Sequence, residues 1–384
     1  MIKKFNVNKV KQLSKIDKII SLFFKKPINS NRENLCDITD ILVIDFSLIG
    51  DIIMDIPFLR NIKYNCPNAK IVLVCMPWAK TILEDQKIVD EFIIFDGKNK
   101  LSTPLKVAIN FMEIISIIKK INKKRYQIGF EPKGDLRHTL FMHYTECDRT
   151  ITYNYTGGSY LVTDSFEPIE GTKHLIDEKL DLLKLAGFGI CQELTIPSLS
   201  IGQDMEQFIQ KFVEINDLKE KTVIGLHPGA SNVNKQYKNY PELVKFIVEY
   251  CEENIFFCIF EGNDEEKIVE QVSSVLQKEQ YVVVKRSLKE YISLVSVCNY
   301  MICNDSAAGH IAAAYDIPVL VIFGPVKDET ASPRGGAKVI PISKEYNCKP
   351  CTLPTCPLKT EVCINSIEVD EVFNCFKELI NPIL

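Results

Sequence analysis

The chain alternates between short apolar runs and longer amphipathic segments. Continuous apolar runs are typical of strands buried on both faces of a parallel sheet, and the segments between them have helical spacing. In the first half, strands are predicted at 41–46, 70–75, 91–95 and 126–131, with helices at 57–64, 107–120 and near 172–187. In the second half, strands are predicted at 222–227, 255–260, 281–285, 300–303 and 319–323, with helices at 240–253, 265–276, 288–297 and 308–315. The pattern predicts an α/β protein with two similar halves.

The length of 384 residues fits two domains of roughly 150 residues each. We expect three segments. Residues 1–37 form a basic amphipathic helix and linker, and residues 38–200 form the first α/β domain. Residues 201–384 form the second α/β domain, with a cysteine cluster near its end. A polar stretch at 197–207 is the predicted connection between the two domains.

The N-terminal segment is strongly basic, with eight lysines and one acid, Asp17, in residues 1–26. Apolar side chains recur there at helical spacing, and Pro27 ends the pattern. These apolar positions are Val10, Leu13, Ile16, Ile20 and Phe23. Two interpretations remain open: attachment to an anionic membrane surface, or an ordinary packed helix with a solvated lysine face.

Charge and hydropathy exclude several classes of protein. The net charge of −4 argues against a nucleic-acid binder. The sequence has neither an apolar run near the ~18 residues needed to span a bilayer nor a clear secretory signal. We therefore expect a cytoplasmic protein, peripheral on the inner membrane face if residues 1–26 bind lipid.

The first candidate chemical motif runs from Phe46 to Asp51, between a predicted strand and a helix. A strand that turns into a helix presents free backbone N–H groups and a positive dipole end, and Gly50 permits a tight backbone there. Asp51 is a candidate general base for an attacking hydroxyl. Its alternative role is that of an N-cap or a first-turn acid that satisfies free amides, and on spacing alone this alternative is the commoner one.

In the second half, His227-Pro228-Gly229-Ala230-Ser231 ends a predicted strand, and Lys235 follows. Amides and the Ser231 hydroxyl can donate hydrogen bonds to a phosphate, and the Lys235 ammonium offsets its charge. The segment is not a P-loop, because G-x-x-x-x-G-K-[ST] is absent.

A second helix start reads Asn304-Asp305-Ser306-Ala307-Ala308-Gly309-His310. Asp305 suits ribose or sugar hydroxyls, Ser306 and the following amides suit a pyrophosphate, and His310 could orient a phosphate. In the alternative interpretation Asp305 is an N-cap and His310 a core residue. Gly324 follows the next strand and allows close backbone approach at the same sheet edge, where open α/β sheets bind ligands.

Four of the fourteen cysteines, Cys348, Cys351, Cys356 and Cys363, are clustered with the spacing C-x2-C-x4-C-x6-C. Four thiolates in so short a segment can hold structural zinc or iron. One or two disulfides, or reduced packing thiols, are the alternatives. In each case we expect a structural element rather than a catalytic centre.

As an ordered set these motifs resemble the heptosyltransferase-like glycosyltransferases of family 9, known from lipopolysaccharide core assembly. The resemblance covers most of residues 41–380 and implies a GT-B architecture, with two Rossmann-like parallel-sheet domains facing a cleft. It implies inverting, metal-independent transfer of a sugar, with no cofactor, from ADP-heptose or a related nucleotide sugar to a lipid-linked or cell-surface saccharide. It rests on Ile41 to Asp51, His227 to Ser231 with Lys235, Asn304 to His310, Phe323-Gly324-Pro325, and the cysteine cluster.

The resemblance also implies roles for single residues. Asp51 matches the base. The donor side comprises Ser231, Lys235, Asp305, Ser306, His310 and Gly324. The segment 133–138 looks like the acceptor-side loop, with Arg137 and His138 as contacts for an anionic acceptor.

The chain also departs from the family pattern. Asp45 stands where members commonly have a basic residue, which predicts a more acidic acceptor side, and Ala307 replaces a glycine. The region 261–264 is where some members have a ribose-binding glutamate.

Two rival functions share this class of fold. A Rossmann oxidoreductase is disfavoured because neither turn contains G-x-G-x-x-G. A non-catalytic sugar-nucleotide-binding or assembly protein with the same fold is the remaining alternative, because fold does not fix function.

Overall fold

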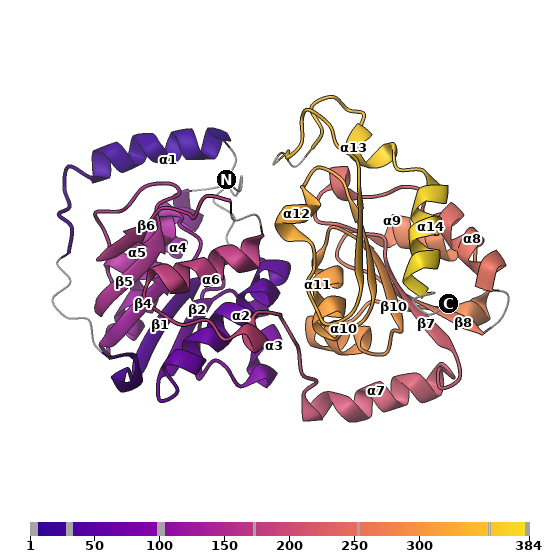
Figure 1. Cartoon of the computed structure of the whole chain (residues 1–384), viewed down its shortest axis with the longest axis horizontal. Coiled ribbons are helices and arrows are strands. Elements are labelled where there is room, and N and C mark those ends of the chain that lie inside the picture. The colour runs from indigo at the N-terminus through magenta and orange to yellow at the C-terminus, as the bar shows by residue number, and fades with distance from the viewer. Residues whose placement is uncertain are drawn as a thin grey trace. The chain divides into compact units, whose positions relative to one another are not determined.

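A computed structural model of the chain describes residues 7–27, 34–97, 104–171, 174–251, 254–351, 353 and 355–380. The chain divides into two compact units, Met1–Thr195 and Ile196–Leu384, each with its own sheet (Figure 1). The predicted helix segments 172–187 and 240–253 and the basic segment 1–26 each include some residues outside the described ranges.

The first unit is a six-stranded, fully parallel sheet in the order β3-β2-β1-β4-β5-β6. Its strands are β1 (Asp40–Asp45), β2 (Lys70–Cys75), β3 (Glu91–Ile94), β4 (Tyr126–Glu131), β5 (Cys147–Tyr153) and β6 (Asp164–Phe166). Its α-helices are α1 (Val7–Ile20), α2 (Ile49–Asn65), α3 (Pro77–Leu83), α4 (Pro104–Ile121), α5 (Leu136–His143) and α6 (Leu175–Leu185). Its 3-10 helices are η1 (Leu35–Asp37), η2 (Glu84–Gln86) and η3 (Gln192–Leu194).

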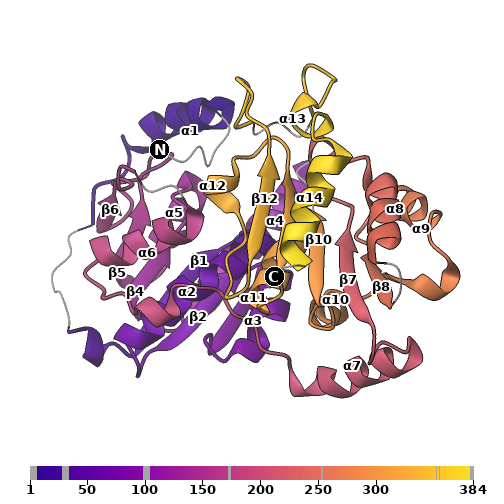
Figure 2. The same ribbon diagram turned by 45° about the vertical axis from the view of Figure 1, so that its right-hand side comes forward.

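The second unit repeats this topology, in the parallel order β12-β11-β10-β7-β8-β9 (Figure 2). Its strands are β7 (Thr222–His227), β8 (Ile255–Phe260), β9 (Tyr281–Val284), β10 (Tyr300–Asn304), β11 (Val319–Phe323) and β12 (Val339–Ser343). Its α-helices are α7 (Gln203–Ile215), α8 (Tyr240–Cys251), α9 (Glu266–Ser273), α10 (Leu288–Val295), α11 (Ala307–Ala314), α12 (Asp328–Ala331), α13 (Val362–Asn365) and α14 (Val369–Ile380). Two 3-10 helices, η4 (Val233–Lys235) and η5 (Lys278–Gln280), complete it.

Both sheets are covered on both faces, which explains their continuous apolar strands. In the first unit, Leu42 and Ile44 of β1 pack with Ile117 and Ile121 of α4. On the opposite face, the Phe58 ring of α2 packs edge-on against the Phe130 ring of β4, with 5.5 Å between the ring centroids. The expected fold class, α/β with two parallel sheets, is confirmed.

The strand order places two switch points where the chain reverses its direction of winding. They lie between β1 and β4 in the first unit and between β7 and β10 in the second. Ligands of doubly wound sheets bind beyond the carboxyl ends of the strands at such points. The candidate motifs follow these four strands, so each unit gathers its own motifs at one edge.

Helix α1 is attached to the first unit along one side only. Leu13 is buried against Leu136 and Leu161. The Asp17 carboxylate accepts hydrogen bonds from the Gly158 amide at 2.8 Å and the Tyr160 hydroxyl at 3.0 Å. The packed-helix interpretation is therefore correct for this side.

The other side of α1 and the turn after it remain exposed. Ile16, Ile19, Leu22 and Phe23 are 47–80% exposed. Lysines flank these apolar side chains. Exposed lysines of this segment are Lys11, Lys15, Lys18, Lys25 and Lys26. None of the described helices is both long and apolar enough to cross a membrane.

Candidate functional site

The carboxyl end of β1 leads directly into α2, and Asp51 lies in the first turn of that helix. Leu48 occupies the N-cap position and provides no side-chain cap. Asp51 is therefore not the N-cap, but its place as the third residue of the helix agrees with the other form of that alternative, a first-turn acid near the free amides. Asp51 is partly exposed and lies at the positive end of the helix dipole.

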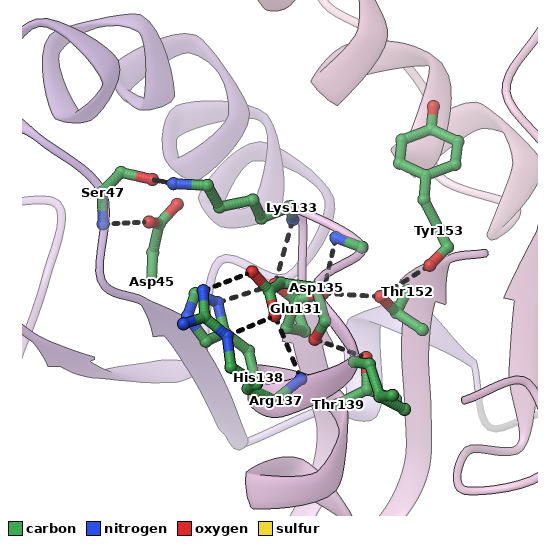
Figure 3. Close-up of polar contacts among 12 residues, drawn as sticks. Asp45, Ser47, Glu131, Lys133, Asp135, Arg137, His138, Thr139, Thr152 and Tyr153 are labelled. Carbon is green, nitrogen blue, oxygen red and sulfur yellow. Dashed lines mark hydrogen bonds and ion pairs between the residues drawn. The ribbon is translucent and has the colours of Figure 1, made fainter. Parts of the chain in front are cut away.

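The neighbouring switch-point strand, β4, ends at the fully buried Glu131. This carboxylate accepts hydrogen bonds from the Gly134 amide and the Thr152 hydroxyl, both at 2.7 Å, and lies 3.2 Å from His138 Nδ1 (Figure 3). Glu131 thus fixes the loop that leads into α5. Sequence reasoning missed it because it reads as the last residue of a strand.

Arg137 and His138, the predicted acceptor contacts, lie in the first turn of α5. Asp135 caps this helix and holds Arg137 in a bidentate pair, with Nε–Oδ1 at 2.9 Å and Nη2–Oδ2 at 2.7 Å. Burial opposes ionisation of Asp135, but hydrogen bonds from Arg137 and the charges of His138 and Arg137 hold its pKa well below the ordinary value. The Arg137 side chain is 61% exposed, so it can meet an anion, whereas His138 is mostly buried against Phe46.

Lys133 is a further basic residue at this edge that sequence reasoning did not assign. Its ammonium lies 3.4 Å from the Ser47 hydroxyl and joins the loops after β1 and β4 (Figure 3). Its position inside the segment 133–138 is the feature of the sequence that could have identified it.

In the second unit, Lys235 and Asp305 meet across the β7–β10 switch point. Their Nζ–Oδ2 distance is 2.6 Å, and both side chains are largely buried. Asp305 is therefore not an N-cap, because Ser306 holds that position in α11. The Ser306 hydroxyl accepts no capping hydrogen bond from the helix amides, and it is buried beside the Cys303 thiol. The first amides of α11 thus have no side-chain cap and can bind an anion.

The other predicted donor residues have different surroundings. Ser231 is exposed on the loop before η4, and His310 is buried in α11. Gly324 approaches the chain itself: a Cβ there would come 2.9 Å from the Asn234 carbonyl. No role was predicted for Asn304 within its motif, yet its side-chain amide donates hydrogen bonds to the carbonyls of Pro228 and Gly229 and holds the loop after β7 against β10.

Glu265 was also missed, although it directly follows the region 261–264. It is buried, accepts a hydrogen bond from the Gly262 amide at 2.6 Å, and lies 3.8 Å from His227 Nε2. Burial lowers the pKa of His227, and Glu265 only partly opposes this. A Cβ at Gly229 would come 1.9 Å from the Glu265 carboxyl carbon, so any larger residue there would have to displace the Glu265 side chain.

Comparison with known proteins identifies the family. The profile of glycosyltransferase family 9 (heptosyltransferase) matches residues 114–361. The chain belongs to glycosyltransferase family 9.

A relative within this family is the lipooligosaccharide heptosyltransferase 2 of Campylobacter jejuni (strain 81116), 28% identical over 167 residues. That match covers 42% of this chain and 52% of the relative, so the chain spans about half the length of this relative. Among solved structures, the family 9 glycosyltransferase of Veillonella parvula is 18% identical with a TM-score of 0.75, covering 92% of this chain and 100% of the other. The ADP-heptose heptosyltransferase II of Escherichia coli is 18% identical with a TM-score of 0.70, covering 89% and 98%. These structures confirm the GT-B type of fold.

Two departures from the family pattern can be judged in the structure. The sequence predicts that Asp45 makes the acceptor side more acidic. Asp45 is only 3% exposed, however, so it adds little negative charge to the surface and this prediction is wrong. Its carboxylate accepts the Ser47 amide at 2.8 Å. Ala307, in place of the family's glycine, begins α11 without disturbing the helix.

The cysteine motif does not form a metal site in the part of the chain that the structure describes. No group of three or more His, Cys, Asp or Glu side chains is placed to hold a metal there, although 352 and 354 lie outside it. Cys348, Cys351, Cys356 and Cys363 are all free, so the disulfide alternatives are not formed either. Backbone amides of Glu361 and Thr360 lower the pKa of Cys356.

Proposed function

We propose that this chain is a heptosyltransferase. It moves heptose, or a related sugar, from an ADP-activated donor to a lipopolysaccharide-type or other cell-surface saccharide. The observation that carries the proposal is the Lys235–Asp305 contact beside the uncapped start of α11. This arrangement offers a cation, a carboxylate and free amides at one switch point, which suits a sugar diphosphate.

The proposed reaction is a single displacement with inversion. Asp51 takes the proton of the acceptor hydroxyl, and the oxygen attacks the anomeric carbon from the face opposite the nucleotide. The bond to the diphosphate breaks as the new glycosidic bond forms. Lys235, Ser231 and the first amides of α11 stabilise the negative charge on the departing diphosphate. The reaction needs no metal ion.

On the acceptor side, we assign the recognition of an anionic saccharide to Arg137 and Lys133. Arg137 is exposed while its guanidinium is oriented by Asp135, and Lys133 lies at the edge between β1 and β4. His138 orients this loop through Glu131 and has little exposed surface for a ligand.

A transfer assay tests the function. Purified protein is incubated with ADP-heptose and a heptose-deficient saccharide acceptor, and the product is followed by mass spectrometry. We expect transfer, and we expect Asp51→Asn to lower turnover by about 10²-fold or more while ADP binding persists. Binding of ADP-heptose without turnover would instead support the alternative, a non-catalytic sugar-nucleotide-binding protein.

We also propose that the protein works at the cytoplasmic membrane face, bound through residues 1–26. The inward side of α1 holds the only acid of this segment, Asp17, in hydrogen bonds. The outward side presents apolar side chains among lysines, a combination that suits anionic lipid. A lipid-linked acceptor would be found at the same surface.

A structural zinc or iron ion at Cys348, Cys351, Cys356 and Cys363 stays a prediction. The spacing of the four thiols supports it, while the free, ungrouped thiols of the described residues do not. Metal analysis of protein purified without chelators decides the point. A combined zinc and iron content below about a tenth of an equivalent per chain would contradict the prediction.

A further inference from the structure

The loop after β7, which carries Lys235, is held at both of its ends by one residue of β10. Asn304 donates hydrogen bonds from its side-chain amide to the carbonyls of Pro228 and Gly229, and its Oδ1 accepts one from the Tyr237 amide at 3.2 Å. The middle of the loop is the 3-10 helix η4, whose last residue is Lys235. None of these three contacts involves η4 itself, so a different contact must hold it.

That contact is made by Asn234, the residue directly before Lys235. Asn234 is only 3% exposed, although its side chain is polar. Its side-chain amide donates a hydrogen bond to the backbone carbonyl of Leu353 at 2.9 Å, across 119 positions of the sequence. The other polar atom of this side chain, Oδ1, is buried and meets no donor among the described residues. The bond to Leu353 is therefore the contact that accounts for a buried asparagine at this position.

The accepting carbonyl belongs to the cysteine segment, residues 348–363, which has anchors of its own. The Cys351 amide donates a hydrogen bond to the Pro325 carbonyl, just beyond the end of β11, at 2.9 Å. The Lys349 side chain is fully buried, and its ammonium donates to the Lys344 carbonyl, just beyond the end of β12, at 3.2 Å. Because the segment is fixed to two strand ends, it can restrain a loop that is bonded to it.

The far end of the cysteine segment is anchored in the core of the second unit. Ile364, directly after it, is fully buried in the core cluster that also contains Tyr237. Gly324 lies against both parts, because a Cβ there would come 2.9 Å from the Asn234 carbonyl and 3.3 Å from Ile364 Cβ. Asn234 is thus enclosed between the turn after β11 and the cysteine segment, and the backbone of its neighbour Lys235 is restrained with it.

We propose that Asn234 is a positioning residue for the donor site: its bond to Leu353 makes the cysteine segment a clamp that holds Lys235 where a nucleoside diphosphate binds. The Asp305 carboxylate orients the Lys235 ammonium, and the clamp fixes the backbone from which that side chain extends. A cation fixed in this way loses less conformational entropy when it binds a diphosphate. This role requires no metal ion at the cysteines. The inference rests on the proposed role of Lys235 in donor binding.

The first test is the affinity of the full chain for ADP, measured by isothermal calorimetry. Asn234→Ala removes the hydrogen bond to the cysteine segment and leaves Lys235 in place. We expect Kd to rise about fivefold, which corresponds to one net hydrogen bond of roughly 1 kcal/mol. Asn365→Ala is the matched control, because the Asn365 amide also donates to a backbone carbonyl, that of Thr360 at 2.8 Å, but only five residues away in the chain. The control should bind ADP like the parent.

A double-mutant cycle shows whether Asn234 acts through Lys235. In the Lys235→Ala background the cation that the clamp positions is absent, so the addition of Asn234→Ala should weaken ADP binding by less than about twofold. A merely structural role would instead lower the affinity by the same factor in both backgrounds, because independent effects add. Equal factors in the two backgrounds therefore overturn the positioning role.

The outcomes separate this inference from the proposed function. If Lys235→Ala binds ADP as tightly as the parent, the donor-site assignment itself is overturned. If Lys235→Ala weakens binding while Asn234→Ala matches the parent, only the clamp is overturned. Should Asn234→Ala fail to fold, Asn234→Leu keeps most of the side-chain volume without the N–H groups, and the same cycle is measured with it.

The second test uses the parent protein and depends on no variant. Coupling between two sites is reciprocal, so a donor loop that ADP has fixed should restrain the cysteine segment in turn. We expect saturating ADP to slow hydrogen exchange of the Cys351 amide by about threefold or more, as followed by mass spectrometry with single-amide resolution. The Gly336 amide, which donates to Asp316 at 2.6 Å before β12 begins, is the control and should exchange at the same rate with and without ADP. An unchanged rate at Cys351 in ADP-saturated protein overturns the clamp.

Discussion

At the scale of single residues, the clearest feature is a contact between Lys235 and Asp305, which are 70 positions apart in the chain. Each residue had been assigned to the donor side from its own motif, but their contact could not be read from the sequence. The pair means that the Lys235 ammonium is oriented before any ligand arrives. An oriented cation loses less side-chain entropy when it binds a diphosphate.

Replacing Lys235 with Ala should therefore weaken ADP binding by about 1–3 kcal/mol, the scale of a hydrogen bond to a charged group. Isothermal calorimetry with ADP measures the change. Lys238→Ala is the matched control, because Lys238 lies three residues further on, is 59% exposed and makes only a 3.7 Å pair with Glu361. Equal affinities for both variants and the parent would place Lys235 outside the donor site.

Asp135 leads to a prediction about pH and stability. Its pKa is held below the ordinary value in the folded protein, so its charge stabilises the native state above about pH 4 and this contribution is lost as the medium is acidified. Asp135→Asn should be less stable than the parent at pH 7 by about 1–3 kcal/mol. The difference should shrink towards pH 3 in chemical unfolding. A gap that widens in acid would contradict the assignment.

The roles of several residues at the carboxyl-end edges of the two sheets could not be predicted from the sequence, and the reason is the same for each. Lys133 meets Ser47 across 86 positions, and Lys179 meets the Asp51 carbonyl across 128. These side chains belong to strand ends or helices without a recognisable motif around them. Only the tertiary packing brings them to their partners. Asp51, Arg137 and Lys235 could be singled out because they belong to motifs of known pattern that follow the ends of strands.

At the scale of elements, the apolar pattern located the central strands and most helices, and it failed where polar residues are buried. Strand β5 was not predicted because it contains Arg149, which is satisfied by Asp164 at 3.1 Å and the Ala186 carbonyl at 3.0 Å. Strand β12 contains Pro341, which an edge strand tolerates. Helix α2 begins at Ile49, well before the predicted start at Pro57, because this proline is accommodated inside the helix.

Helix α1 gives the prediction at this scale. Replacing Ile19, Leu22 and Phe23 together with Ser should abolish co-sedimentation with vesicles containing acidic lipid, because these side chains supply the exposed apolar surface. Binding of the parent should weaken with salt, since each lysine contributes roughly 1 kcal/mol at an anionic surface.

Leu13→Ala is the control for this experiment, because Leu13 faces the protein instead. It should lower stability while it leaves the exposed apolar side chains in place. If the parent stays in the supernatant at low salt, α1 is only a packing element.

At the scale of the whole molecule, each unit has a complete sheet, core and switch point of its own. All donor residues assigned here lie in the second unit, Ile196–Leu384. That unit expressed alone should fold, as judged by circular dichroism and cooperative unfolding. It should bind ADP within about tenfold of the full chain, because no donor contact is assigned to the first unit. A folded second unit without ADP affinity would show that the donor site is incomplete within it.

The contiguity of the two units in the sequence also has a consequence for biosynthesis. Strand β6 ends at Phe166 and α6 at Leu185, whereas the second sheet begins only at Thr222. A ribosome has therefore released every strand of the first sheet before it makes the first strand of the second. If the two sheets formed at the same time, strands of one sheet could pair with strands of the other, because both are parallel and have the same topology. Pairing of distant parallel strands is slow, which leaves time for such errors. Translation in this order separates their assembly in time and limits such mispairing.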